Sequence, residues 1–199
     1  MNILIIEDDE DICQLYSVWL EENRHQFVIA KSAEDGLLEY KNSLQKQKMA
    51  SSSNCRISNF DLVVLDYDIP LKKGSFTSGQ NGLFVAQEIL GINPDQRLMF
   101  ASAWPQKIFT EYVRTLNRVI EILQKPFEKD EFIELAENVV VYDYMKKISK
   151  QMRNNGRNPN KPDINNMGEL FKLLVNLQKA VSKKDGREET DVDIFKNID

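Results

Sequence analysis

The stretch LVVLDYDIP, residues 62–70, decides the fold. Four consecutive apolar residues run directly into Asp66, which is followed by a second aspartate and then by Pro70. An apolar run without alternating polar residues is typical of a strand that is buried on both faces of a parallel sheet. Asp66 would therefore stand where this strand ends, and Pro70 would lie in the loop that follows.

Similar apolar runs recur through the first two thirds of the chain, and amphipathic segments separate them. Alternation of buried strands and helices predicts right-handed βαβ crossovers, and hence an α/β protein with a doubly wound parallel sheet. The expected strands are Ile3–Ile6, Phe27–Ala30, Leu62–Leu65, Leu98–Ala101 and Val119–Leu123.

The segments between these strands differ in character. Apolar residues at helical spacing predict a first helix through residues 12–20, a second from about Asn81-Gly82 and a third over Pro105–Leu116. Two other connections are rich in Ser, Gly, Asn and Lys, which predicts exposed loops at about Ser43–Asn59 and at residues 71–80.

The last third of the chain predicts helices joined by a linker. A long amphipathic helix is expected after Pro126, ending near Met152, and the segment NNGRNPNKPD at 154–163 cannot continue it. A second amphipathic helix is expected over residues 167–181, followed by a disordered tail. The predicted parts are a domain at 1–145 and a helical extension at 146–199.

Composition bounds the class of protein. The 199 residues are 42% hydrophobic and 29% charged, which is ordinary for a globular protein, and no apolar run reaches the roughly 18 residues of a membrane span. We see no signal peptide, and two cysteines, Cys13 and Cys55, favour reduced thiols in the cytoplasm. The single histidine, His25, excludes a multi-histidine metal site, and a net charge of −5 argues against nucleic acid as a partner.

Polar side chains stand where the expected strands end. Because the carboxyl ends of parallel strands meet at one edge of a sheet, where open α/β sheets bind ligands, these side chains should converge. They are Glu7 and Asp8 after the first strand, Asp66 at the end of the third, Ser102 after the fourth and Lys125 after the fifth.

This set of side chains favours phosphoryl chemistry. Neighbouring carboxylates raise each other's pKa unless a cation intervenes, and Mg²⁺ binds one or two carboxylates while it keeps several waters. With Lys125 as a further positive charge, Asp66 would stay ionised and could attack phosphorus as a nucleophile. Mg²⁺, Lys125 and the Ser102 hydroxyl would then hold the phosphoryl oxygens.

Four motifs together resemble the receiver domain of two-component response regulators over about residues 1–145. They are ILIIEDDEDI at 3–12, DYDIP at 66–70, Ser102-Ala103 and Lys125-Pro126-Phe127. The resemblance implies a flavodoxin-like sheet with strand order 2-1-3-4-5 and a cis peptide bond at Lys125-Pro126. It also implies a switch rather than an enzyme, phosphorylated by a sensor histidine kinase or a phosphotransfer protein. The output would be an effector protein or a self-dimer formed through the C-terminal helices.

The resemblance also implies a role for each site residue. Asp66 would be the phosphoacceptor and Asp8 a direct Mg²⁺ ligand, whereas Glu7 would act through metal-bound water. The remaining roles are a backbone carbonyl ligand for the metal at Asp68, and contacts to the phosphoryl group from Ser102 and Lys125.

Two features depart from the family pattern: Ile122 occupies the position of an aromatic switch residue, and the loop at 71–80 is several residues longer than usual. Trp104 follows Ser102 by two residues, at a position that varies within the family. We expect the Trp104 indole to shield an acyl phosphate from water, and the loop to carry a partner contact or to act as a lid.

Other interpretations stay open at this point. Asp9 is expected to cap the first helix, and Glu7 and Asp8 could do the same; Asp66 and Asp68 could be turn residues, and Ser102 a helix cap. The segment 62–70 also resembles the DxDx motif of haloacid-dehalogenase-type Mg²⁺-dependent phosphohydrolases, but that reading leaves Glu7 and Asp8 unexplained. A DNA-binding regulator with a minimal output segment is a third alternative.

Overall fold

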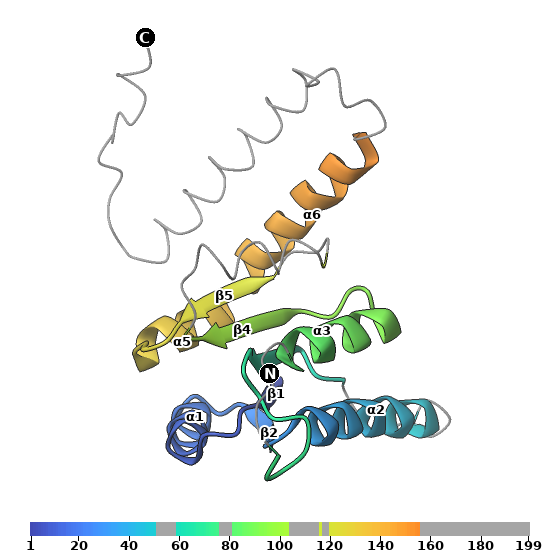
Figure 1. Ribbon diagram of the computed structural model, residues 1–199. Helices are drawn as coiled ribbons and strands as arrows, with labels where there is room; N and C mark the ends of the chain where they lie inside the picture. Colours follow the sequence, from blue (N-terminus) through green and yellow to red (C-terminus); the bar gives the residue numbers. More distant parts are fainter. Residues whose placement is uncertain (51–58, 76–80, 104–115, 117–119, 156–199) are drawn as a thin grey trace, which may run out of the picture. The chain divides into compact units, whose positions relative to one another are not determined.

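The computed structural model describes residues 1–50, 59–75, 81–103, 116 and 120–155. The side chains of these residues are described except at 47–50 and 148–155. Its core is a five-stranded parallel sheet with the strand order β2-β1-β3-β4-β5 (Figure 1). This order confirms the predicted doubly wound α/β fold with strands in the sequence 2-1-3-4-5. The strands are β1 Asn2–Ile6, β2 Gln26–Ala30, β3 Leu62–Asp66, β4 Leu98–Ser102 and β5 Glu121–Gln124.

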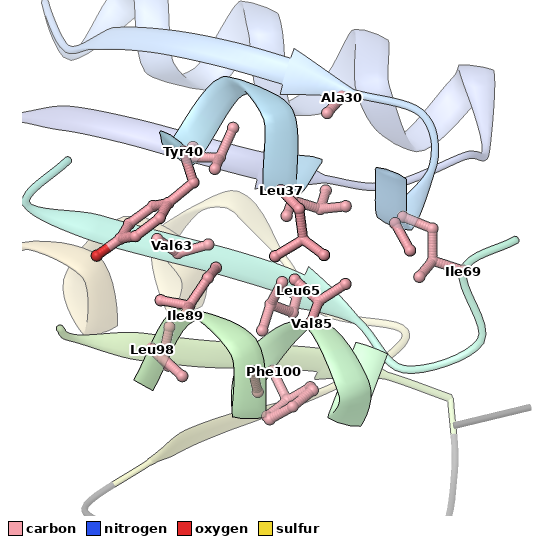
Figure 2. Packing of buried hydrophobic residues seen from close by; sticks show 14 of the residues in the cluster. Ala30, Leu37, Tyr40, Val63, Leu65, Ile69, Val85, Ile89, Leu98 and Phe100 are labelled. Carbon is pink, nitrogen blue, oxygen red and sulfur yellow. The ribbon is translucent and has the colours of Figure 1, made fainter. Parts of the chain in front are cut away.

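The sheet is buried on both faces, which explains why its strands are apolar without alternation. Leu4 and Ile6 of β1 belong to one buried cluster, and Ile3 and Ile5 belong to the other. Burying one such side chain contributes about 1.5–3 kcal/mol, so both faces stabilise the fold. The covering helices are α2 Ala33–Ala50 and α3 Asn81–Ile92 on the first cluster (Figure 2), and α1 Glu10–Glu22 and α5 Lys129–Glu137 on the second.

The first part of one expected loop is helical. The prediction of a loop from about Ser43 is wrong as far as Ala50, because α2 continues to that residue. The residues involved are mostly Gln, Lys, Leu and Met, which have high helix propensity. The partly buried Leu44 also packs on the sheet cluster, which anchors the added turns. The part of this connection at 51–58 lies outside the described residues.

The long helix expected after Pro126 is broken. It consists of α5 and of α6, Val139–Asn155, which are separated at Asn138 with φ −78° and ψ 57°. The chain divides into two compact units at the same point, Met1–Asn138 and Val139–Asp199. The division falls at the helix break rather than at residue 145, and the assignment of receiver and extension stays a prediction.

The helix expected over Pro105–Leu116 lies outside the described residues except for Leu116, as do Trp104 and the second C-terminal helix. The linker predicted at 154–163 is wrong at its first two residues, because α6 continues to Asn155, and the rest of it lies outside the described residues. Within the described ranges, no helix combines the length and the apolar character that crossing a bilayer requires.

Candidate functional site

The carboxyl end of β1 places two acidic residues at the edge of the sheet. The Glu7 backbone N–H donates to the Ala30 carbonyl at 3.0 Å, which continues the pairing with β2 and holds Glu7 in place. Glu7 is only 1% exposed, whereas Asp8 is exposed. Asp9 caps α1, because its carboxylate accepts hydrogen bonds from the N–H groups of Asp11 at 2.9 Å and Ile12 at 3.1 Å. The prediction that Asp9 caps the first helix is thus confirmed, whereas Glu7 is buried at the end of β1.

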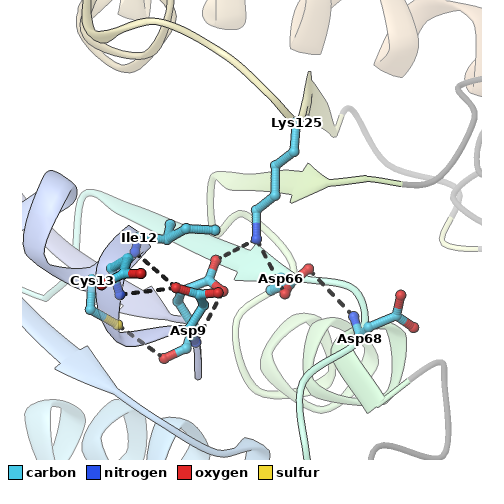
Figure 3. A network of polar contacts seen from close by, with 8 residues as sticks. Asp9, Ile12, Cys13, Asp66, Asp68 and Lys125 are labelled. Atoms are coloured by element: carbon cyan, nitrogen blue, oxygen red, sulfur yellow. Dashed lines mark hydrogen bonds and ion pairs between the residues drawn. The ribbon is translucent and has the colours of Figure 1, made fainter.

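Lys125 contacts carboxylates at the ends of both β1 and β3. Its ammonium Nζ lies 2.7 Å from Glu7 Oε2 and 3.2 Å from Asp66 Oδ2, and Figure 3 shows the side chain extending toward Asp66. The Lys125 N–H donates to the Ser102 carbonyl at 2.8 Å, and the Lys125-Pro126 peptide bond is cis, as expected. The residue that follows the fifth strand therefore places its ammonium group beside carboxylates that lie far away in the sequence.

Three carboxylates gather beside that cation. One oxygen from each of Glu7, Asp8 and Asp66 lies within 4.8 Å of the other two. Burial, and then the charge of Asp66, raises the pKa of Glu7 to about 7, although Lys125 acts in the opposite direction. Burial is also the main cause that raises the pKa of Asp8. The single positive charge of Lys125 does not balance three carboxylates. A hard divalent cation, which prefers oxygen ligands, fits this set of donors.

The two remaining predicted residues lie next to this cluster. Ser102 is buried, 2% exposed, and ends β4 one residue beyond Ala101, the register partner of Asp66. The Asp68 N–H donates to Asp66 Oδ1 at 3.4 Å, so the turn after β3 contacts the carboxylate it follows (Figure 3). From the sequence, Asn81 and Gly82 are predicted only to begin a helix, but both contact this same turn.

The raised pKa of Glu7 predicts an unusual dependence of stability on pH. Without metal, folded Glu7 takes up a proton near pH 7 and unfolded Glu7 near pH 4.5, so the folded state holds the extra proton between these values. The free energy of unfolding should therefore fall as pH rises through this window, by up to about 3 kcal/mol. Urea denaturation in EDTA, compared between wild type and Glu7→Gln, isolates this contribution, and equal slopes in both proteins would contradict it.

Comparison with known proteins bears on the fold. The sequence matches no family model and no curated protein. Among solved structures, a response regulator receiver domain protein (CheY-like) from Methanospirillum hungatei JF-1 is similar with a TM-score of 0.54 at 16% identity, covering 72% of this chain and 97% of that one. CheY4 of Vibrio cholerae gives 0.52 at 14% identity, covering 69% and 97%. A CheX-CheY-BeF3-Mg²⁺ complex from Borrelia burgdorferi gives 0.54 at 16%, covering 70% and 89%.

The sheet order described above is that of the CheY-like group of doubly wound folds. The class that the architecture defines is the CheY-like α/β fold, with its polar groups at the carboxyl ends of the strands. Within that class, the chain has the fold of response regulator receiver domains.

Proposed function

We propose that this chain is a phosphorylation-dependent signalling switch in which Asp66 accepts a phosphoryl group. The observation that carries the proposal is the contact of Lys125 Nζ with both Glu7 and Asp66, beside the Asp8 carboxylate. A structural ion pair needs one carboxylate, whereas here one ammonium contacts two, and an oxygen of the Asp8 carboxylate lies within 4.8 Å of an oxygen of each. The receiver-domain fold agrees with this function, because open α/β sheets of this kind bind ligands at the carboxyl ends of their strands.

The chemistry follows from the charges. An Asp66 carboxylate oxygen attacks phosphorus, and the bond between phosphorus and the donor's leaving atom breaks, with its electron pair going to the leaving group. With a phosphohistidine donor the leaving atom is an imidazole nitrogen, and the product is an acyl phosphate on Asp66. Lys125 is already oriented toward Asp66 and would offset the charge that arrives with the phosphoryl oxygens, and Ser102 would donate its hydroxyl to them.

The acidic residues would hold Mg²⁺. Asp8 and Asp66 offer direct carboxylate ligands, Asp68 a backbone carbonyl, and Glu7 a contact through metal-bound water. When bound, Mg²⁺ would neutralise part of the charge of the phosphoryl oxygens. Its binding would also favour the ionised form of Glu7.

The partners follow from the same chemistry. The phosphoryl donor would be a sensor histidine kinase or a phosphotransfer protein, and one structural neighbour is itself described as a complex of CheY with CheX. Phosphorylation adds up to about two negative charges at Asp66, which can shift a balance between conformations. Helix α6 exposes Val139, Val140 and Met145, which suits contact with an effector or with a second copy of the chain.

Acetyl phosphate with Mg²⁺ tests the proposal. Intact-mass spectrometry should find one added phosphoryl group per chain, lost on treatment with hydroxylamine as acyl phosphates are. Omission of Mg²⁺ should abolish the gain. Catalytic turnover of a phosphomonoester without a stoichiometric adduct would favour the haloacid-dehalogenase-type alternative, and neither adduct nor turnover would reject both.

A further inference from the structure

The turn after Asp66 is held from two sides by the starts of helices. Four of its backbone carbonyls accept hydrogen bonds from donors in the first residues of α2 and α3. The first N–H groups of a helix have no partner within the helix, so they are available for such contacts. The accepting residues are Tyr67, Ile69, Pro70 and Leu71.

Helix α3 supplies the contacts nearest to Asp66. The Gly82 N–H donates to the Tyr67 carbonyl at 3.1 Å, and Asn81 Nδ2 donates to the Ile69 carbonyl at 2.9 Å. The backbones also approach closely, because a Cβ added at Gly82 would lie 2.2 Å from the Asp66 carbonyl oxygen and 2.9 Å from Tyr67 Cα. Both neighbours are backbone atoms, so a side chain at position 82 has to displace the turn itself.

Helix α2 supplies the contacts on the other side. The N–H groups of Ala33 and Glu34 donate to the carbonyls of Pro70 and Leu71 at 2.9 and 3.0 Å. The start of α2 is itself fixed, because the Ser32 hydroxyl accepts from the Asp35 N–H at 3.1 Å. The Pro70–Leu71 end of the turn is therefore held by α2. A displacement imposed at Gly82 would move the opposite end of the turn, where Asp66 and Asp68 lie.

We infer that Asn81 and Gly82 are positioning residues, which set the Asp66 carboxylate and the Asp68 backbone at the spacing that a cation and a phosphoryl group require. This inference rests on the proposed function. Mg²⁺ accepts only near-octahedral geometry at about 2.0–2.1 Å, so a backbone shift of about half an ångström matters. Groups that hold ligands in place, without touching the metal, typically change metal affinity by about 10–100-fold when they are replaced.

Helix α3 contains a matched pair of glycines for the test. A Cβ added at Gly91 meets nothing within 4 Å, so Gly91→Ala makes the same chemical change in the same helix without a collision. Gly91→Ala should raise stability by up to about 1 kcal/mol and leave the Mg²⁺ dissociation constant unchanged. Gly82→Ala should raise that constant by about tenfold or more in the folded protein.

The measurement is a calorimetric Mg²⁺ titration of each variant, well below a melting temperature determined separately by circular dichroism. Both glycine variants can change the melting temperature, but only a positioning role moves the metal affinity of folded protein. Asn81→Ala, which removes the hydrogen bond to the Ile69 carbonyl and adds no atoms, should weaken Mg²⁺ binding severalfold. It decides the matter if Gly82→Ala does not fold.

The outcomes separate this inference from the function on which it rests. If wild type binds Mg²⁺ and is phosphorylated, and the folded Gly82→Ala and Asn81→Ala proteins bind it as Gly91→Ala does, the positioning role is wrong and the function stands. If wild type itself neither binds Mg²⁺ nor accepts a phosphoryl group, both are wrong. Weakened binding in the Asn81 and Gly82 variants alone supports the inference.

Discussion

Asp66→Asn should abolish phosphorylation by acetyl phosphate while leaving the fold intact. The amide is nearly isosteric with the carboxylate, but its oxygen is not a nucleophile for phosphorus at neutral pH. Asp66 lies at the end of β3 and its carboxylate contacts Lys125, so the substitution removes the reacting group without opening a cavity. Intact-mass spectrometry should find no added phosphoryl group, and circular dichroism should match that of wild type.

Asp68→Asn is the matched control, since it makes the same chemical change two residues further along. The proposed role of Asp68 belongs to its backbone carbonyl, which the substitution retains. This variant should therefore still gain one phosphoryl group, with at most a modest change in rate. An Asp66→Asn protein that is phosphorylated as fully as wild type would place the acceptor elsewhere.

Local sequence was enough to predict the sheet and the approach of Glu7, Asp66 and Lys125 at one edge of it. Val63 and Val64 pack on opposite faces of the sheet, so the run that contains them had to be apolar throughout. Parallel strands align their carboxyl ends, and this alone predicts that Glu7, Asp66 and Lys125 approach one another. The distances of 2.7 and 3.2 Å at Lys125 agree with that expectation, whereas the chemical roles of these residues stay predictions.

Features that depend on distant partners could not be predicted. The apolar positions continue from Leu135 into Val139, so nothing local ends α5 at Asn138. The backbone contacts of Gly82 with the turn at Asp66 and Tyr67 likewise depend on how α3 packs, which the sequence does not encode in any short pattern. Helix α2 was not among the predicted helices, and its part from Ser43 was predicted as a loop because its polar composition resembles that of one; the packed Leu44 anchors this part.

The end of α5 is capped by a buried arginine that directly precedes β4. Arg97 is 5% exposed, and its guanidinium forms a two-point ion pair with Glu121 of β5 at 2.7 Å for each contact. It also donates to the carbonyls of Ala136 at 2.6 Å and Leu135 at 2.7 Å, in the last turn of α5. Carbonyls at a helix end lack partners within the helix, so Arg97 satisfies two of them while it neutralises Glu121.

Arg97→Met should therefore destabilise the protein by about 3–5 kcal/mol, the cost of leaving a buried charge without its partner. Burial raises the pKa of Glu121 even with Arg97 present, so removing the guanidinium should raise it further and lead Glu121 to bind a proton. Arg97→Lys should recover only part of the loss, because one ammonium cannot reproduce the planar fork that reaches four acceptors. Urea denaturation at neutral pH measures each change.

The double variant Arg97→Met with Glu121→Met separates charge from helix capping. Replacing both partners removes the buried charge, so most of the loss should be recovered. A residual cost of about 1–3 kcal/mol should remain, because the Leu135 and Ala136 carbonyls still lack their donor. If Arg97→Met alone costs less than about 1 kcal/mol, the ion pair is dispensable. Full recovery in the double variant would instead mean that the end of α5 does not need this cap.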